Sequence, residues 1–438
     1  MFSVVRRHVH VVFRTSVLLP ITLACAGCGV GTGSAGMGNA GTGGVGTGDA
    51  ALVAEGGAAD EAAGGVGIAS AGAESGAIFG VNAHHPGFLI GEKLDEAQIK
   101  FVRVDLGWAW FLTMDLNCQR SLPGKPGCDH IHAINSVYFD IPDGFRARGI
   151  TILVNLAYRY DDNNPIPPEP EFSHCTQANS CVPRTNDPTN AAWRTFLEEW
   201  DAYVTAMVQD VGTMVPYFGI WNEPNATYPN GTKAFFAGYD WQYDELVTRA
   251  CTILHANGSK CVAPSTAIYT DTEQNFQRDL SWHKARVQAN RQLIDVADGH
   301  IYDYHANFAA RAAAFAAGSD SIADIPFWVT ETAPFVSDPV LDRPGFNLEL
   351  QERELVQQLA DLRTGISGID GLFYYDLQSV EFGLVEALSI TEYLSRPAFN
   401  ALVQLSRGTY RVPPAGQCTD TRGAFCTAAC LASGYECP

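Results

Sequence analysis

The chain has 438 residues, of which 46% are hydrophobic and 17% are charged, so it can bury a large globular core. Its formal net charge is −20, and it contains no run of Lys or Arg. A surface that binds nucleic-acid phosphates needs such basic residues, so the composition argues against a nucleic-acid partner.

The N-terminus has the pattern of an export signal. Arg6, Arg7 and Arg14 precede a short apolar run that ends at Ala24 and is too short to span a bilayer as a mature helix. Small residues precede both Cys25 and Cys28, as they do at a bacterial lipoprotein cleavage site. Two alternatives stay open: lipid attachment at one of these cysteines, or ordinary signal-peptidase cleavage nearby. Either predicts a signal peptide over residues 1–28 and an exported protein, secreted or anchored at the cell surface.

Residues 29–76 consist almost entirely of Gly, Ala, Ser, Thr and Val. Such a composition buries too little apolar surface to offset the entropy of ordering, so we expect a flexible linker. Gly31–Gly36 matches the dinucleotide-binding fingerprint formally, but no strand precedes it and no helix follows. The sequence therefore predicts no nucleotide cofactor.

From residue 77 to residue 407, short apolar segments alternate with helix-like patterns such as Ala191–Val211, Gln242–Ala256 and Leu348–Thr364. We expect eight strands, near Ile78–Asn82, Phe101–Asp105, Thr151–Asn155, Tyr217–Trp221, Cys261–Pro264, Gly299–Tyr302, Phe327–Glu331 and Leu372–Asp376. Strands that alternate with helices form parallel sheets. The repetition predicts an α/β protein with a (β/α)8 TIM barrel, and a doubly wound sheet is the competing fold.

The remaining cysteines fall in close pairs, which in an exported protein indicates disulfides rather than metal ligands. We expect Cys118–Cys128, Cys175–Cys181 and Cys251–Cys261. Residues 408–438 form a short tail, with two further bonds among Cys418, Cys426, Cys430 and Cys437. His130 and His132 have no third ligand nearby in the sequence, so no metal site is expected.

Two glutamates follow apolar strand patterns directly. Glu223 lies in Trp221-Asn222-Glu223-Pro224-Asn225 after strand four, and Glu331 lies in Thr330-Glu331-Thr332 at the end of strand seven. The carboxyl ends of barrel strands share one rim, so the two side chains can face each other. A facing pair of carboxyl groups is the arrangement of glycoside hydrolases.

These motifs resemble glycoside hydrolase clan A, and within it family 39 and related, family 5-like retaining glycosidases. The resemblance extends over the barrel, through Phe101–Trp108, Gly149–Asn155, Gly299–Tyr302 and Arg396–Leu402. It implies that Glu331 is the nucleophile and Glu223 the general acid/base. Many clan members end strand eight with a tryptophan, where this chain has Phe373, Tyr374 and Tyr375.

The resemblance also implies a set of residues that surround the sugar. Arg103 and Tyr302 would hold Glu331, and Asn222 would bind the sugar 2-hydroxyl. Further contacts to the substrate are expected from His84, His85, Trp108, His300 and Tyr375. Asn225-Ala-Thr227 matches a glycosylation sequon, which we interpret as accidental.

The expected partner is an oligo- or polysaccharide of plant or microbial origin, bound by a monomer. A catalytically idle carbohydrate-binding protein of the cell surface, on the same barrel, is the alternative. A serine hydrolase is disfavoured because no strand ends in a Gly-x-Ser-x-Gly turn placed before a helix.

Overall fold

The computed structural model describes residues 77–83, 90–108, 145, 148–160, 165–212, 215–228, 231–269, 272–302, 308–333, 337–338, 343–344, 348–365, 368–378, 383–389 and 392–410. The expected signal peptide, the Gly/Ala-rich linker, Cys118–Cys128, the two histidines at 130 and 132, and the tail beyond residue 410 lie outside these residues.

Nine described strands form one parallel sheet, in the order β5-β4-β3-β2-β1-β11-β8-β7-β6. Their bounds are β1 Ile78–Asn82, β2 Phe101–Gly107, β3 Thr151–Ala157, β4 Tyr217–Ile220, β5 Lys260–Val262, β6 Thr266–Tyr269, β7 Ala297–Tyr302, β8 Phe327–Thr332 and β11 Gly371–Tyr374. Each is an apolar, largely buried run, as expected for strands that are covered on both faces. The eight expected strands are present within a few residues of their predicted bounds.

The two ends of this sheet are consecutive pieces of one barrel strand. β5 pairs with β4, and its last residue, Val262, also bridges Val296 immediately before β7. β6 then pairs with β7 from Thr266 onward. The predicted fifth strand, Cys261–Pro264, was therefore too short, because the strand breaks around Pro264 and resumes. Proline has no N–H to donate to a sheet ladder, which accounts for the break. The sheet closes into the expected (β/α)8 barrel.

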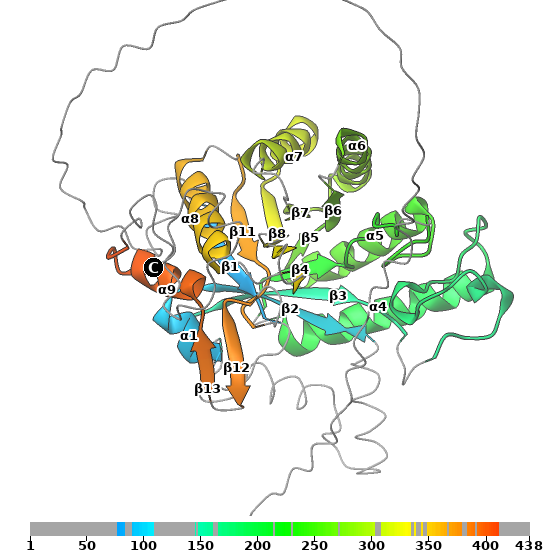
Figure 1. Ribbon diagram of the computed structural model, residues 1–438. Coiled ribbons are helices and arrows are strands. Elements are labelled where there is room, and N and C mark those ends of the chain that lie inside the picture. Colours follow the sequence, from blue (N-terminus) through cyan, green and yellow to red (C-terminus); the bar gives the residue numbers. More distant parts are fainter. Residues whose placement is uncertain are drawn as a thin grey trace, which may run out of the picture. The chain divides into compact units, whose positions relative to one another are not determined.

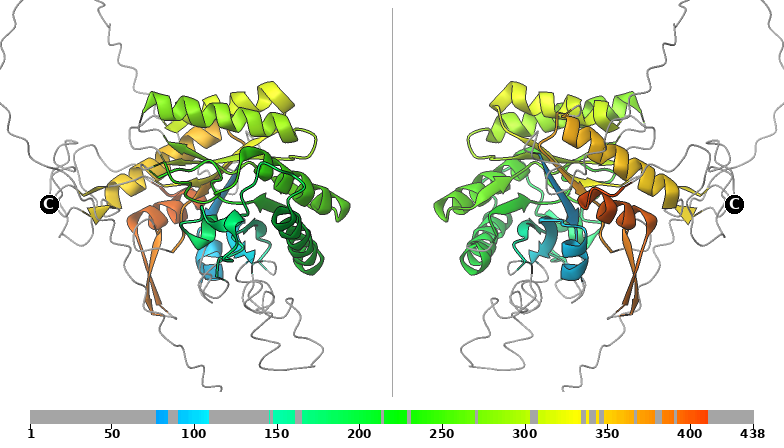
Figure 2. Two further views of the ribbon diagram at one scale, coloured as in Figure 1. Left: turned by 90° about the vertical axis from the view of Figure 1, so that its right-hand side faces the viewer. Right: turned by 90° about the vertical axis from the view of Figure 1, so that its left-hand side faces the viewer.

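Helices cover the outside of the barrel (Figures 1 and 2). They are α1 Ile90–Glu96, α4 Ala191–Val211, α5 Asp240–Ala256, α6 Glu273–Asn290, α7 Phe308–Ala323, α8 Leu348–Thr364 and α9 Pro397–Ser406. Two short 3₁₀ turns, Pro170–Phe172 and Ala178–Ser180, precede α4. Two antiparallel pairs complete the described elements: β9 Ser337–Asp338 with β10 Arg343–Pro344, and β12 Val385–Ser389 with β13 Glu392–Ser395. In the described part of the chain, no helix is both long and apolar enough to cross a membrane.

An apolar layer fills the barrel below the strand ends. It consists of Leu153, Val262, Val296, Trp328 and Phe373, each at most 5% exposed and contributed by different strands or strand ends. A larger core lies between the sheet and the helices. The interior layer closes the bottom of the barrel, which leaves the carboxyl ends of the strands as the place for a site.

Two of the predicted disulfides lie within the described residues, and both are present: Cys175–Cys181 and Cys251–Cys261. The first closes the segment between β3 and α4, and the second ties α5 to β5. Structural disulfides persist in oxidising compartments.

We expect the double replacement Cys251→Ala/Cys261→Ala to lower the free energy of unfolding by about 3 kcal/mol. A cross-link that closes a loop of this length restricts the unfolded chain by roughly that amount. Both cysteines are fully buried, so the loss of two sulfur atoms adds to the effect. Denaturant unfolding measures it, with Cys175→Ala/Cys181→Ala as the matched pair. An unchanged free energy of unfolding in Cys251→Ala/Cys261→Ala would show that this disulfide does not restrict the unfolded chain.

Candidate active site

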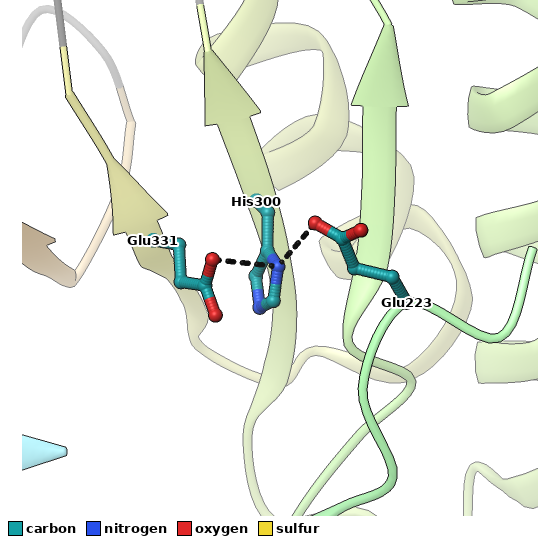
Figure 3. Close-up of side chains that lie close together, drawn as sticks. All are labelled: Glu223, His300 and Glu331. Atoms are coloured by element: carbon teal, nitrogen blue, oxygen red, sulfur yellow. Dashed lines mark hydrogen bonds and ion pairs between the residues drawn. The ribbon is translucent and has the colours of Figure 1, made fainter. Parts of the chain in front are cut away.

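Glu223 and Glu331 approach each other at the carboxyl ends of the strands, with His300 between them (Figure 3). His300 Nδ1 lies 2.8 Å from Glu223 Oε1 and 3.4 Å from Glu331 Oε2. One carboxylate oxygen of each glutamate and a ring nitrogen of His300 all lie within 4.8 Å of one another. The structure thus brings the two predicted glutamates to one point.

The backbone after β4 aims Glu223 at this point. Trp221 and Glu223 have φ values of 66° and 45°, in the left-handed region that costs a residue with a side chain about 1–3 kcal/mol. The surroundings hold this turn: Trp221 Nε1 donates to the carbonyl of Phe235 at 2.5 Å. The Asn225 side chain donates to and accepts from the backbone of Ala267, at 2.7 and 2.8 Å. Asn225 is only 7% exposed, and its buried side chain holds this turn in place.

An irregularity in β8 turns the side chain of Glu331 toward the inside of the barrel. Trp328 belongs to the interior layer, so strict alternation would turn Thr330 inward and Glu331 outward. The pairing with β7 shifts between Val329 and Glu331, which leaves Thr330 as an extra residue. Both side chains then reach polar partners: Thr330 donates to Asp298, and Glu331 contacts Arg103. A bulge of this kind redirects a side chain at a functional site.

Both oxygens of Glu331 accept hydrogen bonds. Arg103 Nη1 lies 2.5 Å from Oε1, and the Tyr302 hydroxyl donates to Oε2 at 2.7 Å. Burial lowers the pKa of Arg103, but the nearby charges of Asp105, Glu331 and Asp298 outweigh it and raise the pKa, so Arg103 keeps its charge. Burial and the charge of Glu331 raise the pKa of Tyr302 well above its ordinary value, so its hydroxyl stays protonated as a donor. Together the two donors stabilise negative charge on Glu331.

His300 lies against both carboxylates. Its side chain is fully buried, and Nδ1 bonds Glu223. His300 therefore positions Glu223, and its expected contact with the substrate stays a prediction. Burial lowers the pKa of His300. The charge of Glu331 and the hydrogen bond to Glu223 raise the pKa by more than burial lowers it, so the net shift is upward. These groups favour a protonated Nδ1 that donates to the carboxylates.

Asn222 lies beside Arg103, whose Nη2 donates to its amide oxygen at 3.1 Å. That bond sets the orientation of the amide. Tyr158, which follows β3 with a φ of 59°, also hydrogen-bonds the Asn222 side chain. With its oxygen engaged by Arg103, Asn222 can present an N–H to a ligand.

Of the three aromatic residues at strand eight, only Tyr375 lies at the site. Its ring centre is 6.1 Å from that of Tyr302, nearly perpendicular to it. Phe373 is in the interior layer, and the Tyr374 hydroxyl accepts a hydrogen bond from Gln351 on α8. Successive strand residues point to opposite faces, so one alone can reach the rim.

Trp108 lies outside the site. It is 1% exposed and packs against Phe196, Trp200 and Tyr203, with the Arg159 guanidinium over its ring. These side chains cover the ring of Trp108, and its expected contact with the sugar stays a prediction. His84 and His85 lie outside the described residues.

Sequence reasoning missed Asn82 and Tyr158. Asn82 accepts from Arg103 at 2.8 Å and donates to the carbonyl of Thr330 at 3.0 Å, so it links three barrel strands beneath Glu331. A polar residue that ends an apolar strand was a usable signal for Asn82. Nothing local in the sequence marks Tyr158, since its contact with Asn222 comes from the next strand.

The group Glu223, His300 and Glu331 has the donor types that hold a divalent cation such as Zn²⁺. These donors already have partners, however. His300 Nδ1 bonds Glu223, and Glu331 bonds Arg103 and Tyr302. The arrangement is therefore a complete carboxylate pair that can perform acid, base and nucleophilic chemistry at one carbon atom.

No protein-family model and no curated protein matches the sequence. Among solved structures, the chain is similar to a family 1 β-glucosidase from Thermotoga maritima, with 11% identity, a TM-score of 0.50 and coverage of 77% of this chain and 98% of that one. A Thermotoga maritima family 1 glycoside hydrolase complexed with a cyclophellitol analogue transition state mimic gives 12% identity, the same coverage and a TM-score of 0.50. At this identity the similarity establishes the architecture: the chain has the (β/α)8 barrel fold of these structures.

Proposed function

We propose that the protein is a retaining glycoside hydrolase that cleaves O-glycosidic bonds of an oligo- or polysaccharide by double displacement. The observation that carries the proposal is the pair Glu223 and Glu331, at the ends of strands four and seven, with carboxylate oxygens within 4.8 Å. Retaining enzymes hold their two carboxyl groups about 5–5.5 Å apart, and inverting enzymes about 6.5–9.5 Å apart. The clan A motifs and the barrel fold support the same activity.

The surroundings of the two carboxylates favour one distribution of roles. Glu331 is held on both oxygens by Arg103 and Tyr302, which suits a group that must be anionic and rigidly placed to attack carbon. Glu223 is held on one oxygen, Oε1, by His300. Its other oxygen is then the one that can exchange a proton with the substrate. We therefore assign Glu331 as the nucleophile and Glu223 as the general acid/base.

In the first step, a Glu331 oxygen forms a bond to the anomeric carbon while the bond to the leaving oxygen breaks. Glu223 gives that oxygen its proton, so the leaving group departs as an alcohol. Arg103 is freed from part of its charge pairing as Glu331 becomes an ester. Asn222 is oriented by Arg103 and Tyr158. In this proposal it donates to the sugar 2-hydroxyl, a contact that strengthens in the transition state.

In the second step, Glu223 acts as a base. It removes a proton from water, whose oxygen attacks the anomeric carbon and releases Glu331 as a carboxylate. The proton taken from water restores the acid form of Glu223 for the next cycle. Two inversions at one carbon give net retention.

We expect the first-formed sugar to have the anomeric configuration of the substrate. Proton NMR of an aryl glycoside digest, recorded before mutarotation, measures this. A first product of opposite configuration would exclude double displacement, even with activity present.

The alternative is an idle carbohydrate-binding protein on the same barrel. Both glutamates and their partners Arg103, Tyr302 and His300 are in place, which favours catalysis. A panel of aryl α- and β-glycosides separates the two, because an idle binder hydrolyses none of them while still binding oligosaccharides.

A further inference from the structure

A cavity of about 520 Å³ lies between the segment after β3 and the first turns of α4. Its lining includes Arg159, Tyr160, Phe172, Thr195 and Glu199. None of these residues takes part in the chemistry proposed above. The volume is within the range of about 300–1,000 Å³ that is typical of small-molecule sites.

The cavity opens at the catalytic end of the barrel. In a (β/α)8 barrel, the segment from a strand to its following helix lies at the carboxyl ends of the strands. β3 ends at Ala157, and α4 begins at Ala191. The next residue, Tyr158, hydrogen-bonds Asn222 at the catalytic site, and Arg159 already lines the cavity. The cavity and the site thus involve consecutive residues at the end of β3.

The lining combines an apolar floor with polar groups above it. Tyr160, Phe172 and Phe196 are each at most 7% exposed and form the base. Arg159 and Glu199 stand at the side, joined by an ion pair of 3.1 Å, and Thr195 is exposed beside them. Glu169 adds a further acid, so the lining has no excess of positive charge. Such a surface suits a neutral ligand with an apolar face and many hydroxyls, and disfavours an anion.

Several bonds hold the described walls of the cavity in place. The disulfide Cys175–Cys181 closes the segment that follows Phe172. Glu171 joins this segment to the start of α4, because its side chain accepts from Asn190 at 3.3 Å and its carbonyl accepts from Arg184 at 3.0 Å. Asn190 in turn caps α4 by accepting from the backbone of Trp193. A preformed cavity loses less entropy on binding.

We propose that this cavity is a distal subsite, which holds a neutral sugar unit of the same glycan chain that is cleaved between Glu223 and Glu331. The inference rests on the proposed function and narrows it to substrates several sugars long. The more exposed apolar side chains of the lining, Pro165, Pro167, Ala191 and Ala192, can contact the C–H face of a pyranose ring above the buried floor. The Arg159–Glu199 pair offers donors and acceptors to its hydroxyls.

The test fills the cavity from its exposed side with Thr195→Trp. The matched control is Arg194→Trp, which adds the same indole to the same turn of α4 at an exposed position outside the lining. We expect Thr195→Trp to lower the ratio of kcat/KM for hexasaccharides to kcat/KM for aryl monoglycosides by about tenfold, which corresponds to about 1.4 kcal/mol. Cello-, xylo-, manno- and laminari-oligosaccharides of two to six units are the probes. Arg194→Trp should keep the ratio, and melting temperatures verify that both variants fold.

Binding measured without turnover separates this inference from the proposed function. Calorimetric titration of the same oligosaccharides into Glu331→Gln, with and without Thr195→Trp, reports on the cavity even if no glycoside is cleaved. Weaker hexasaccharide binding on filling supports the subsite. Equal affinity in both proteins, or no binding of any oligosaccharide, overturns it. Failure to hydrolyse any glycoside would instead count against the proposed function alone.

Discussion

Replacement of Glu331 by Gln is expected to abolish turnover of every glycoside, with kcat falling by about four orders of magnitude or more. The amide is a poor nucleophile, so no glycosyl-enzyme forms, whatever the leaving group. The amide also removes the negative charge that Arg103 and Tyr302 hold at 2.5 and 2.7 Å. Steady-state kinetics on nitrophenyl and dinitrophenyl glycosides measure the effect.

The control for this variant is Glu198→Gln, which makes the same chemical change at an exposed position on α4. It should leave kcat unchanged. A Glu331→Gln protein that folds normally and keeps more than a few per cent of the activity would remove Glu331 from the role of nucleophile.

Replacement of Glu223 by Gln should instead give an effect that depends on the leaving group. For substrates with poor leaving groups, kcat/KM is expected to fall by about 10²–10⁴-fold, the usual contribution of a general acid. Dinitrophenyl glycosides need no protonation, so their first step should remain fast. The glycosyl-enzyme then accumulates, because Glu223 must also activate water, and a burst followed by slow turnover should be visible.

Added azide distinguishes the roles of the two glutamates. It needs no general base, so it should restore turnover of Glu223→Gln and yield a glycosyl azide of retained configuration. Any azide product from Glu331→Gln should have the opposite configuration, because azide would then replace the missing nucleophile. Rescue of Glu331→Gln with retained configuration would show that the two roles are reversed.

The sequence by itself determined the architecture and the place of the two carboxylates to which we assign the reaction. The (β/α)8 barrel could be read from it because each strand is a nearly continuous apolar run, buried on both faces. Glu223 and Glu331 could be found because a carboxylate that directly follows such a run must lie at the rim shared by all parallel strands. Local spacing also sufficed for Cys175–Cys181 and Cys251–Cys261, whose partners are close along the chain.

Only the tertiary structure decided which neighbouring side chains face the glutamates. The irregularity at Thr330 turns Glu331 toward Arg103, and one residue of shift reverses the direction of a strand side chain. His300 turned out to hold Glu223, and Trp108 to pack against α4, although each lies near a strand end as expected. Sequence spacing predicts how far along its strand a residue lies, and so whether it is near the carboxyl end of the barrel. Its direction depends on bulges, strand breaks such as that at Pro264, and partners on other strands, which the local sequence does not encode.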